Sequence, residues 1–107
     1  MNNQEAFTTS ARHLLKQDRK SLDHRQGCAY RAGKLKCAIG CLIPDDQYFK
    51  NLEGKSVAHI YYQIPALEGL DSDLLIALQK VHDDSRSDNW SSKLQSIAKQ
   101  HKLKWEI

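Results

Sequence analysis

Several features are missing from this chain, and each absence excludes a class of protein. No apolar run approaches the ~20 residues that a membrane-spanning helix needs, so we expect no membrane partner. The first residues, Met1–Glu5, lack the basic start and the apolar stretch of a secretory signal, which favours a cytoplasmic protein. There are three cysteines, and an odd number argues against a framework made only of disulfides. In a reducing cytosol these cysteines would be thiols or metal ligands.

No internal repeat, low-complexity tract or linker divides the chain. Its 107 residues are close to the common size of one domain and long enough to bury one modest core. Hydrophobic residues at 40% and charged residues at 27% are ordinary for a globular protein. We therefore expect a single domain over residues 1–107.

The net charge of +3 hides an uneven distribution along the sequence. Residues 1–43 carry a net charge of +5, residues 44–88 carry −5, and residues 89–107 carry +3. If the two basic ends meet in space, they could form a face for nucleic acid or for an acidic partner. The alternative is that the segments neutralise one another within a small domain.

Four stretches have the apolar spacing and capping residues of amphipathic helices. Asn2 or Asn3 can cap a helix over about residues 3–17, and Ser56 a short one over Val57–Gln63 that Pro65 stops. Asp71 or Ser72 can cap a helix over about 72–84, and Ser87 or Asp88 one over about 89–102. The apolar stripes are Phe7, Ala11, Leu14 and Leu15; Val57, Ile60, Tyr61 and Ile64; Leu74, Leu75, Leu78, Val81 and His82; and Trp90, Leu94, Ile97, Ala98 and His101.

A β-hairpin is expected around Gly33, because two short runs that can pair flank a glycine able to adopt positive φ. With Ala32 and Gly33 as a two-residue loop, Arg31 faces Lys34, Tyr30 faces Leu35, and Cys28 faces Cys37. The apolar run Ala38–Ile43 that follows is the end of a buried strand or a short helix. We favour the helix, which Pro44 would end.

These elements predict an α+β fold with four to five helices around one small antiparallel hairpin. Trp105 and Ile107 are expected to pack back against the core.

The first candidate for chemistry is a zinc site. Four residues of types that bind zinc occur within a short stretch, and a hairpin followed by a helical turn could present them. However, the spacing lacks the usual C-x2-C pairs, and a cysteine in an apolar run commonly acts as a small hydrophobe. Buried thiols, or a cross-strand disulfide between Cys28 and Cys37, are the alternatives. The four candidate metal ligands are His24, Cys28, Cys37 and Cys41.

Two further candidates involve catalysis. Cys37 at a helix start could be a nucleophile with His24, His59 or His82 as its base, although no family signature surrounds it. Carboxylates could instead hold a hard cation or act as acid and base. Within that set His82 and Asp83 stand out, because acids at a helix C-terminus oppose the helix dipole. A structural role for them is the simpler interpretation. The carboxylate set is Asp45, Asp46, Glu53, Asp83 and Asp84.

A fourth candidate is nucleic-acid binding through the basic N-terminal half. Basic side chains interleaved with an exposed aromatic residue are suited to tracking a phosphate backbone and stacking on bases. Most solvated helices carry similar charges, so the pattern has low specificity. The residues concerned are Arg12, Lys16, Arg19, Lys20, Arg25, Tyr30, Arg31, Lys34 and Lys36.

The cysteine-containing stretch also resembles a group of small bacteriophage and prophage proteins of unknown function. The resemblance rests on Cys28-x-Tyr30-Arg31, Lys36 to Asp45 (KCAIGCLIPD), Tyr48, Glu53-Gly54, Leu78-Gln79-x-Val81-His82-Asp83 and Trp90. It covers about Leu14 to Ile97 and implies a phage-associated, cytoplasmic protein. It implies no particular activity, cofactor or catalytic residue. Small accessory phage proteins often act by binding a host protein, including the host's defence machinery, and that association is one of class only.

With the phage association that the resemblance implies, we expect an accessory protein that binds a host macromolecule without catalysis, most simply a host protein. The contacts would be Tyr30, Arg31, Lys34 and Lys36 on the hairpin, together with the acidic segment. The alternatives are a nucleic-acid-binding protein and a metal- or thiol-dependent enzyme. No cofactor is expected unless the cysteines hold zinc.

Overall fold

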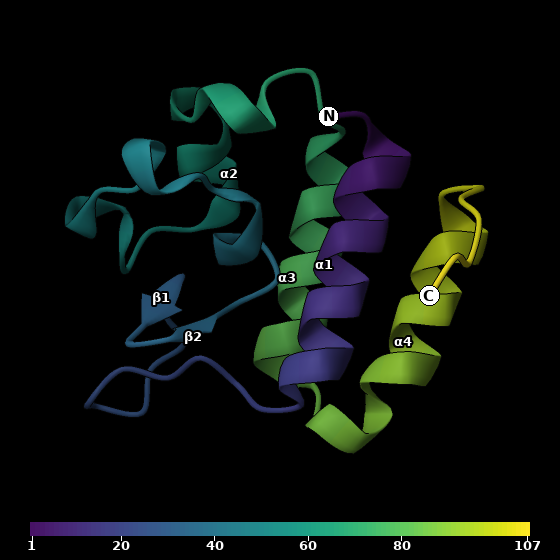
Figure 1. The fold of residues 1–107 in the computed structure, drawn as a ribbon, viewed down its shortest axis with the longest axis horizontal. Coiled ribbons are helices and arrows are strands. Elements are labelled where there is room, and N and C mark those ends of the chain that lie inside the picture. Colours follow the sequence, from purple (N-terminus) through teal and green to yellow (C-terminus); the bar gives the residue numbers. More distant parts are fainter.

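The computed structural model describes residues 1–107 and has the predicted α+β fold (Figure 1). Three helices, α1, α3 and α4, pack against one another. A smaller part lies beside α1 and α3 and consists of the hairpin, the short helix α2 and several 3-10 turns (Figure 1). One apolar core of 24 residues joins the two parts. No helix in the structure is long and apolar enough to cross a membrane.

The three long helices confirm the sequence prediction closely. α1 spans Asn3–Gln17, α3 spans Ser72–Asp84, and α4 spans Trp90–Gln100 after a 3-10 turn at Ser87–Asn89. Asn2 caps α1, with its side chain accepting from the Glu5 N–H at 2.8 Å while the Glu5 carboxylate accepts from the Asn2 N–H at 2.9 Å. The predicted stripe residues of all three helices lie at the core, apart from the less buried Leu15 and His101.

The hairpin exists, but the predicted loop lies one residue too early, so the predicted strand register is wrong by two residues. β1 is Arg31–Ala32 and β2 is Leu35–Lys36, with Arg31 opposite Lys36, so the loop is Gly33-Lys34. Gly33 has φ +62° at the first loop position, which is where a type II′ turn requires glycine. The predicted loop would place Ala32 there instead, and an alanine resists positive φ.

This change of register separates the two cysteines that were expected to face each other. Tyr30 now lies opposite Cys37, whose N–H donates to the Tyr30 carbonyl at 3.2 Å. Cys28 instead forms an isolated β-bridge with Leu22. The structure contains no disulfide.

The apolar run after the hairpin forms one 3-10 turn, Gly40–Leu42, in place of the expected short helix. Two constraints keep the turn short. Gly40 presses against the hairpin, since a Cβ built on it would lie 1.9 Å from the Tyr30 carbonyl oxygen. Pro44 disfavours helical backbone at Ile43, which is extended at φ −93° and ψ 116°.

The rest of the smaller part is built from short helical turns. α2 is Val57–Ile60, shorter than predicted, and continues as a 3-10 turn over Tyr61–Gln63. Ser56 stands at its N-cap position, but its hydroxyl pairs with the His59 ring at 2.7 Å in place of a backbone N–H. The remaining 3-10 turns are Asp45–Gln47, Lys50–Leu52 and Pro65–Leu67.

The C-terminal residues return along α1, as expected. Gln4 exchanges hydrogen bonds with the main chain of Lys104 at 2.8 and 3.0 Å, and Arg12 donates to the Glu106 carbonyl. The Trp105 ring lies 6.2 Å from that of Phe7. Trp105 is nevertheless 39% exposed, so it lies at the edge of the core without entering it, and Ile107, at 44% exposure, stays outside the core.

Candidate functional site

Two of the four predicted partner-binding residues on the hairpin are structural. Tyr30 is buried, and its hydroxyl donates to the Lys55 carbonyl at 2.6 Å. The Arg31 guanidinium pairs with Asp45 at 2.7 Å, donates to the Ile43 carbonyl and lies 4.6 Å from the centre of the Tyr48 ring. Tyr30 therefore cannot stack on a base, and Arg31 is not a free cation.

The other two hairpin lysines differ in exposure. Lys34 is exposed at the loop, while Lys36 is half-buried and its main chain is held by hydrogen bonds to Gln17 and His13. Of the predicted contact residues, Lys34 alone is exposed.

Glu53 holds the main chain where the hairpin begins. Its carboxylate accepts from the N–H groups of Tyr30 at 2.8 Å and Arg31 at 3.1 Å, and from the Tyr48 hydroxyl at 2.6 Å. Burial, followed by the hydrogen bond and charge of Glu53, raises the pKa of Tyr48 to about 12. Glu53, considered above as a metal ligand or acid, is here the anchor between the hairpin and the turns that follow it.

The structure does not bring the four predicted zinc ligands together. His24 is exposed in the loop before the hairpin. Cys37 is buried, and its sulfur accepts from the Gly40 N–H at 3.2 Å, while the Cys41 thiol donates to the Ala38 carbonyl at 3.2 Å. Burial raises the pKa of both thiols to about 12, which makes Cys37 unsuited to be the nucleophile considered above.

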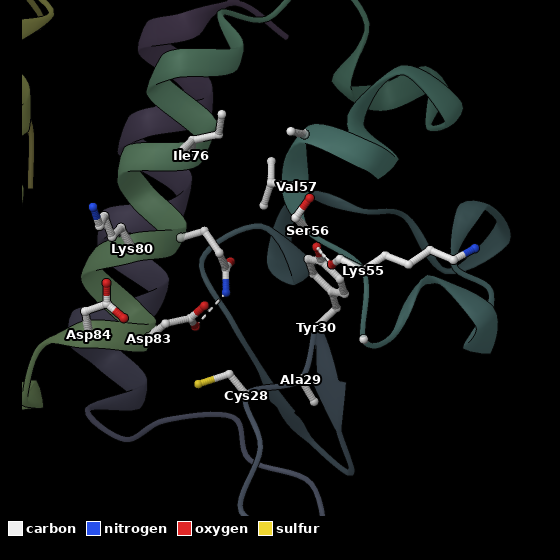
Figure 2. Close-up of a pocket in the computed structure, with 13 residues that line it drawn as sticks. Cys28, Ala29, Tyr30, Lys55, Ser56, Val57, Ile76, Lys80, Asp83 and Asp84 are labelled. Carbon is white, nitrogen blue, oxygen red and sulfur yellow. Dashed lines mark hydrogen bonds between the residues drawn. The ribbon is translucent and has the colours of Figure 1, made fainter.

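Only Cys28 of that set joins a chemically interesting cluster. Its sulfur, a His82 ring nitrogen and an Asp83 carboxylate oxygen all lie within 4.8 Å of one another. Figure 2 shows Cys28 and Asp83 facing each other across the space between α3 and the chain that leads into β1. Sequence reasoning had singled out His82 and Asp83, and the fold adds Cys28 to them.

Hydrogen bonds define the protonation of this cluster. His82 is fully buried and stacks on Trp90 with ring centres 5.7 Å apart. The Ser21 N–H donates to His82 Nε2 at 2.9 Å, so that nitrogen is an acceptor and the ring proton lies on Nδ1. Nδ1 then donates to Asp83 Oδ1 at 2.7 Å. His82 is therefore a neutral ring.

The same arrangement bears on zinc. A neutral imidazole has one nitrogen lone pair to offer a metal, and here the Ser21 N–H occupies it. A zinc ion on Nδ1 would require the proton to move to Nε2, where it would oppose the Ser21 N–H. The hydrogen-bonded cluster thus does not fit a three-ligand zinc site.

Asp83 is the centre of the cluster and is held as a carboxylate. Burial acts to raise its pKa, but hydrogen bonds from His82 and Cys28, electrostatic attraction to His82 and a hydrogen bond from Gln79 outweigh burial and leave the pKa below its ordinary value. The Gln79 amide donates to Oδ1 at 2.8 Å. Burial, and next the charge of Asp83, raise the pKa of Cys28 to about 11, so Cys28 is a thiol near neutral pH. A nucleophilic cysteine needs the opposite shift.

A cavity of about 530 Å³ opens beside this cluster, between α3 and the hairpin (Figure 2). Its polar side includes Cys28, Asp83 and Asp84, and its apolar side includes Ile76 and Val57. Two lysines also line it. Figure 2 shows the ammonium groups of Lys55 and Lys80 pointing away from its centre.

Two further hollows share lining residues with this cavity or with each other. One of about 460 Å³ shares Gly54, Lys55 and Ser56 with the cavity and includes Tyr62. Another of about 670 Å³ shares Gln63 with that hollow and includes Phe49. We call the three together the hollowed face. Its residues come from 28–30, 48–52, 54–59, 62–64 and from Ile76, Gln79, Lys80, Asp83 and Asp84.

The exposed large hydrophobic side chains fall into two groups. Met1, Trp105 and Ile107 belong to the terminal segments. The other three, Phe49 at 59% exposure, Tyr62 at 70% and Ile76 at 41%, all line the hollowed face. Sequence reasoning missed this face, because Phe49 and Tyr62 lie outside any regular stripe and Ile76 adjoins a helix stripe that is otherwise buried.

Comparison of the chain with protein-family models, with curated protein sequences and with solved structures gave no match.

Proposed function

We propose that this chain is a small phage-associated accessory protein that binds a host protein in the cytoplasm without catalysing a reaction. The hollowed face is the contact surface in this proposal, replacing the hairpin tip. The observation that carries it is that every exposed large hydrophobic side chain outside the terminal segments lies on that face. Exposed aromatic side chains beside hollows are typical of the residues that contribute most to binding between proteins.

The chemistry of the cluster beside the cavity favours binding over catalysis. The Cys28 thiol has a raised pKa, and the lone pair of the His82 ring is engaged by Ser21. A cysteine nucleophile needs a neighbouring base with a free lone pair. The hydrogen bonds of the cluster fix the positions of the His82 and Asp83 side chains, which is a structural role.

The proposal is tested by affinity capture from host lysate with the wild-type chain, followed by calorimetry with the captured protein after purification. Replacing Phe49 and Tyr62 by alanine should weaken binding at least about tenfold, since each exposed aromatic is expected to contribute more than about 1 kcal/mol. Ile107→Ala is the control, because Ile107 is also a large exposed hydrophobic residue, at 44% exposure, but lies off the hollowed face. Equal affinity of the double variant and the wild type would overturn the proposed contact surface.

A further inference from the structure

Asp83 is a carboxylate at the edge of a cavity, and no cation pairs with it. Its one ion-pair contact is with His82, which is neutral because Ser21 occupies the other ring nitrogen. The nearest lysine contact, from Lys20, is to the Asp83 main-chain oxygen at 3.0 Å and not to the carboxylate. The donors that the carboxylate receives are thus all neutral groups.

A negative charge that is two-thirds buried and lacks a cation is unusual, because such charges are normally paired. Neutral donors orient the carboxylate but leave its charge uncompensated. Its neighbour Asp84 also lines the cavity, and the two lysines of the lining, Lys55 and Lys80, direct their ammonium groups away from its centre (Figure 2).

The wall next to these acids is apolar. Ile76 from α3 and Val57 from α2 line it, with the Tyr30 ring below (Figure 2). The cavity thus combines an aliphatic wall with a carboxylate at one end. This combination suits a flexible aliphatic chain that ends in a cation, as lysine and arginine side chains do.

We infer that this cavity receives a lysine or arginine side chain of the bound partner protein, with the aliphatic stem against Ile76 and Val57 and the cationic head at Asp83. The inference rests on the proposed function, and it adds the chemistry by which the partner is recognised. Charge complementarity selects this occupant, since a neutral or acidic side chain would leave Asp83 unpaired.

To test this, the full chain is titrated with small-molecule probes, and binding is monitored through the amide chemical shifts in NMR spectra. The probes are the N-acetyl N-methylamides of arginine and lysine, with citrulline as the neutral isostere of arginine. Both cationic probes should give saturable shifts at Cys28, Gln79 and Asp83, whereas citrulline should give none. No saturable shift, or equal shifts with citrulline, would overturn the inference.

Variants of the chain test whether the probes bind at Asp83. Asp83→Asn should weaken binding of the arginine probe about tenfold or more, as expected when a charge-assisted hydrogen bond is lost. Glu68→Gln removes an exposed charge outside the cavity and should leave binding unchanged. Because Asp83 also anchors His82, Ile76→Lys provides a second variant. It places a cation on the exposed apolar wall and should likewise abolish the shifts.

The two proposals fail in different ways. If the captured host protein depends on Phe49 and Tyr62 but the cationic probes do not bind, the inference is wrong and the proposed function stands. If the probes bind through Asp83 but no captured protein depends on the aromatic pair, the proposed function is wrong. The assignment of the cation to a partner protein then falls with it.

Discussion

Buried polar side-chain atoms in this protein differ in whether they have a hydrogen-bond partner. Ser10 and Ser21 are both fully buried, yet the Ser10 hydroxyl donates to the Ala38 carbonyl at 2.8 Å while the Ser21 hydroxyl has no partner. A buried hydroxyl stabilises the fold when it is paired and destabilises it when it is not. The two serines therefore form a natural comparison.

Ser10→Ala should lower the free energy of unfolding by about 1 kcal/mol, because it removes a buried hydrogen bond. Ser21→Ala should leave that free energy unchanged or raise it slightly, because the Ser21 contacts to His82 and Ala29 use only main-chain atoms. Urea unfolding followed by circular dichroism measures both. A larger loss for Ser21→Ala than for Ser10→Ala would show that the Ser21 hydroxyl has a partner in solution.

The reactivity of Cys28 should report the charge of Asp83. With its pKa raised to about 11, Cys28 should react slowly with iodoacetamide near pH 8 and much faster toward pH 11. Asp83→Asn removes the nearby negative charge and should shift the reaction profile of Cys28 to lower pH. Peptide mass spectrometry separates Cys28 from the buried Cys37. An unchanged profile in the variant would contradict the contact between Cys28 and Asp83.

Among the elements, the helices were predictable and the hairpin register was not. The limits of α1 and α3 follow from apolar spacing and from caps at Asn2 and Asp71, which are local properties of the sequence. The register depends on which loop position Gly33 takes, and both choices use the same residues. The turn at Gly40 was missed because its cause, the nearby Tyr30 carbonyl, lies on another element.

Gly40→Ala tests this close approach between the 3-10 turn and the hairpin. A methyl group 1.9 Å from the Tyr30 oxygen cannot be accommodated without moving the backbone, so we expect a loss of about 3 kcal/mol or more. Gly33→Ala is the control, since its Cβ would meet no atom within 4 Å. It carries only the cost of positive φ, about 1–2 kcal/mol. Thermal unfolding of both variants gives the comparison, and a milder effect at Gly40 than at Gly33 would disprove the contact.

At the scale of the whole molecule, the cluster beside the cavity depends on distant segments that the core brings together. Cys28 precedes the hairpin, whereas His82 and Asp83 end α3. Two separate features of the sequence pointed to these residues. Cys28 lies in the cysteine-containing stretch, and Asp83 is an acid at a helix C-terminus, where it opposes the helix dipole. Their meeting requires the packing of the smaller part against α3, and no local pattern encodes that packing.

Acid should destabilise the molecule partly through Asp83. Because the folded pKa of Asp83 lies below the unfolded value of ~3.9, its ionised form stabilises the fold above that pH. This contribution is lost as pH falls through the folded pKa. The free energy of unfolding should therefore fall less steeply below about pH 4 in Asp83→Asn than in the wild type. Urea titrations at a series of pH values measure the slopes, and equal slopes would contradict the lowered pKa.

The three hydrogen bonds to Glu53 have a consequence for the speed of association. They join β1 to the segment around Tyr48, and Tyr30 adds a bond to Lys55, so residues that line the cavity and the hollow at Tyr48 are tied together. A partner would then meet a surface whose shape exists before the encounter. Little conformational entropy should be lost on binding, and the association rate should be limited by diffusion and orientation instead of by rearrangement of this chain.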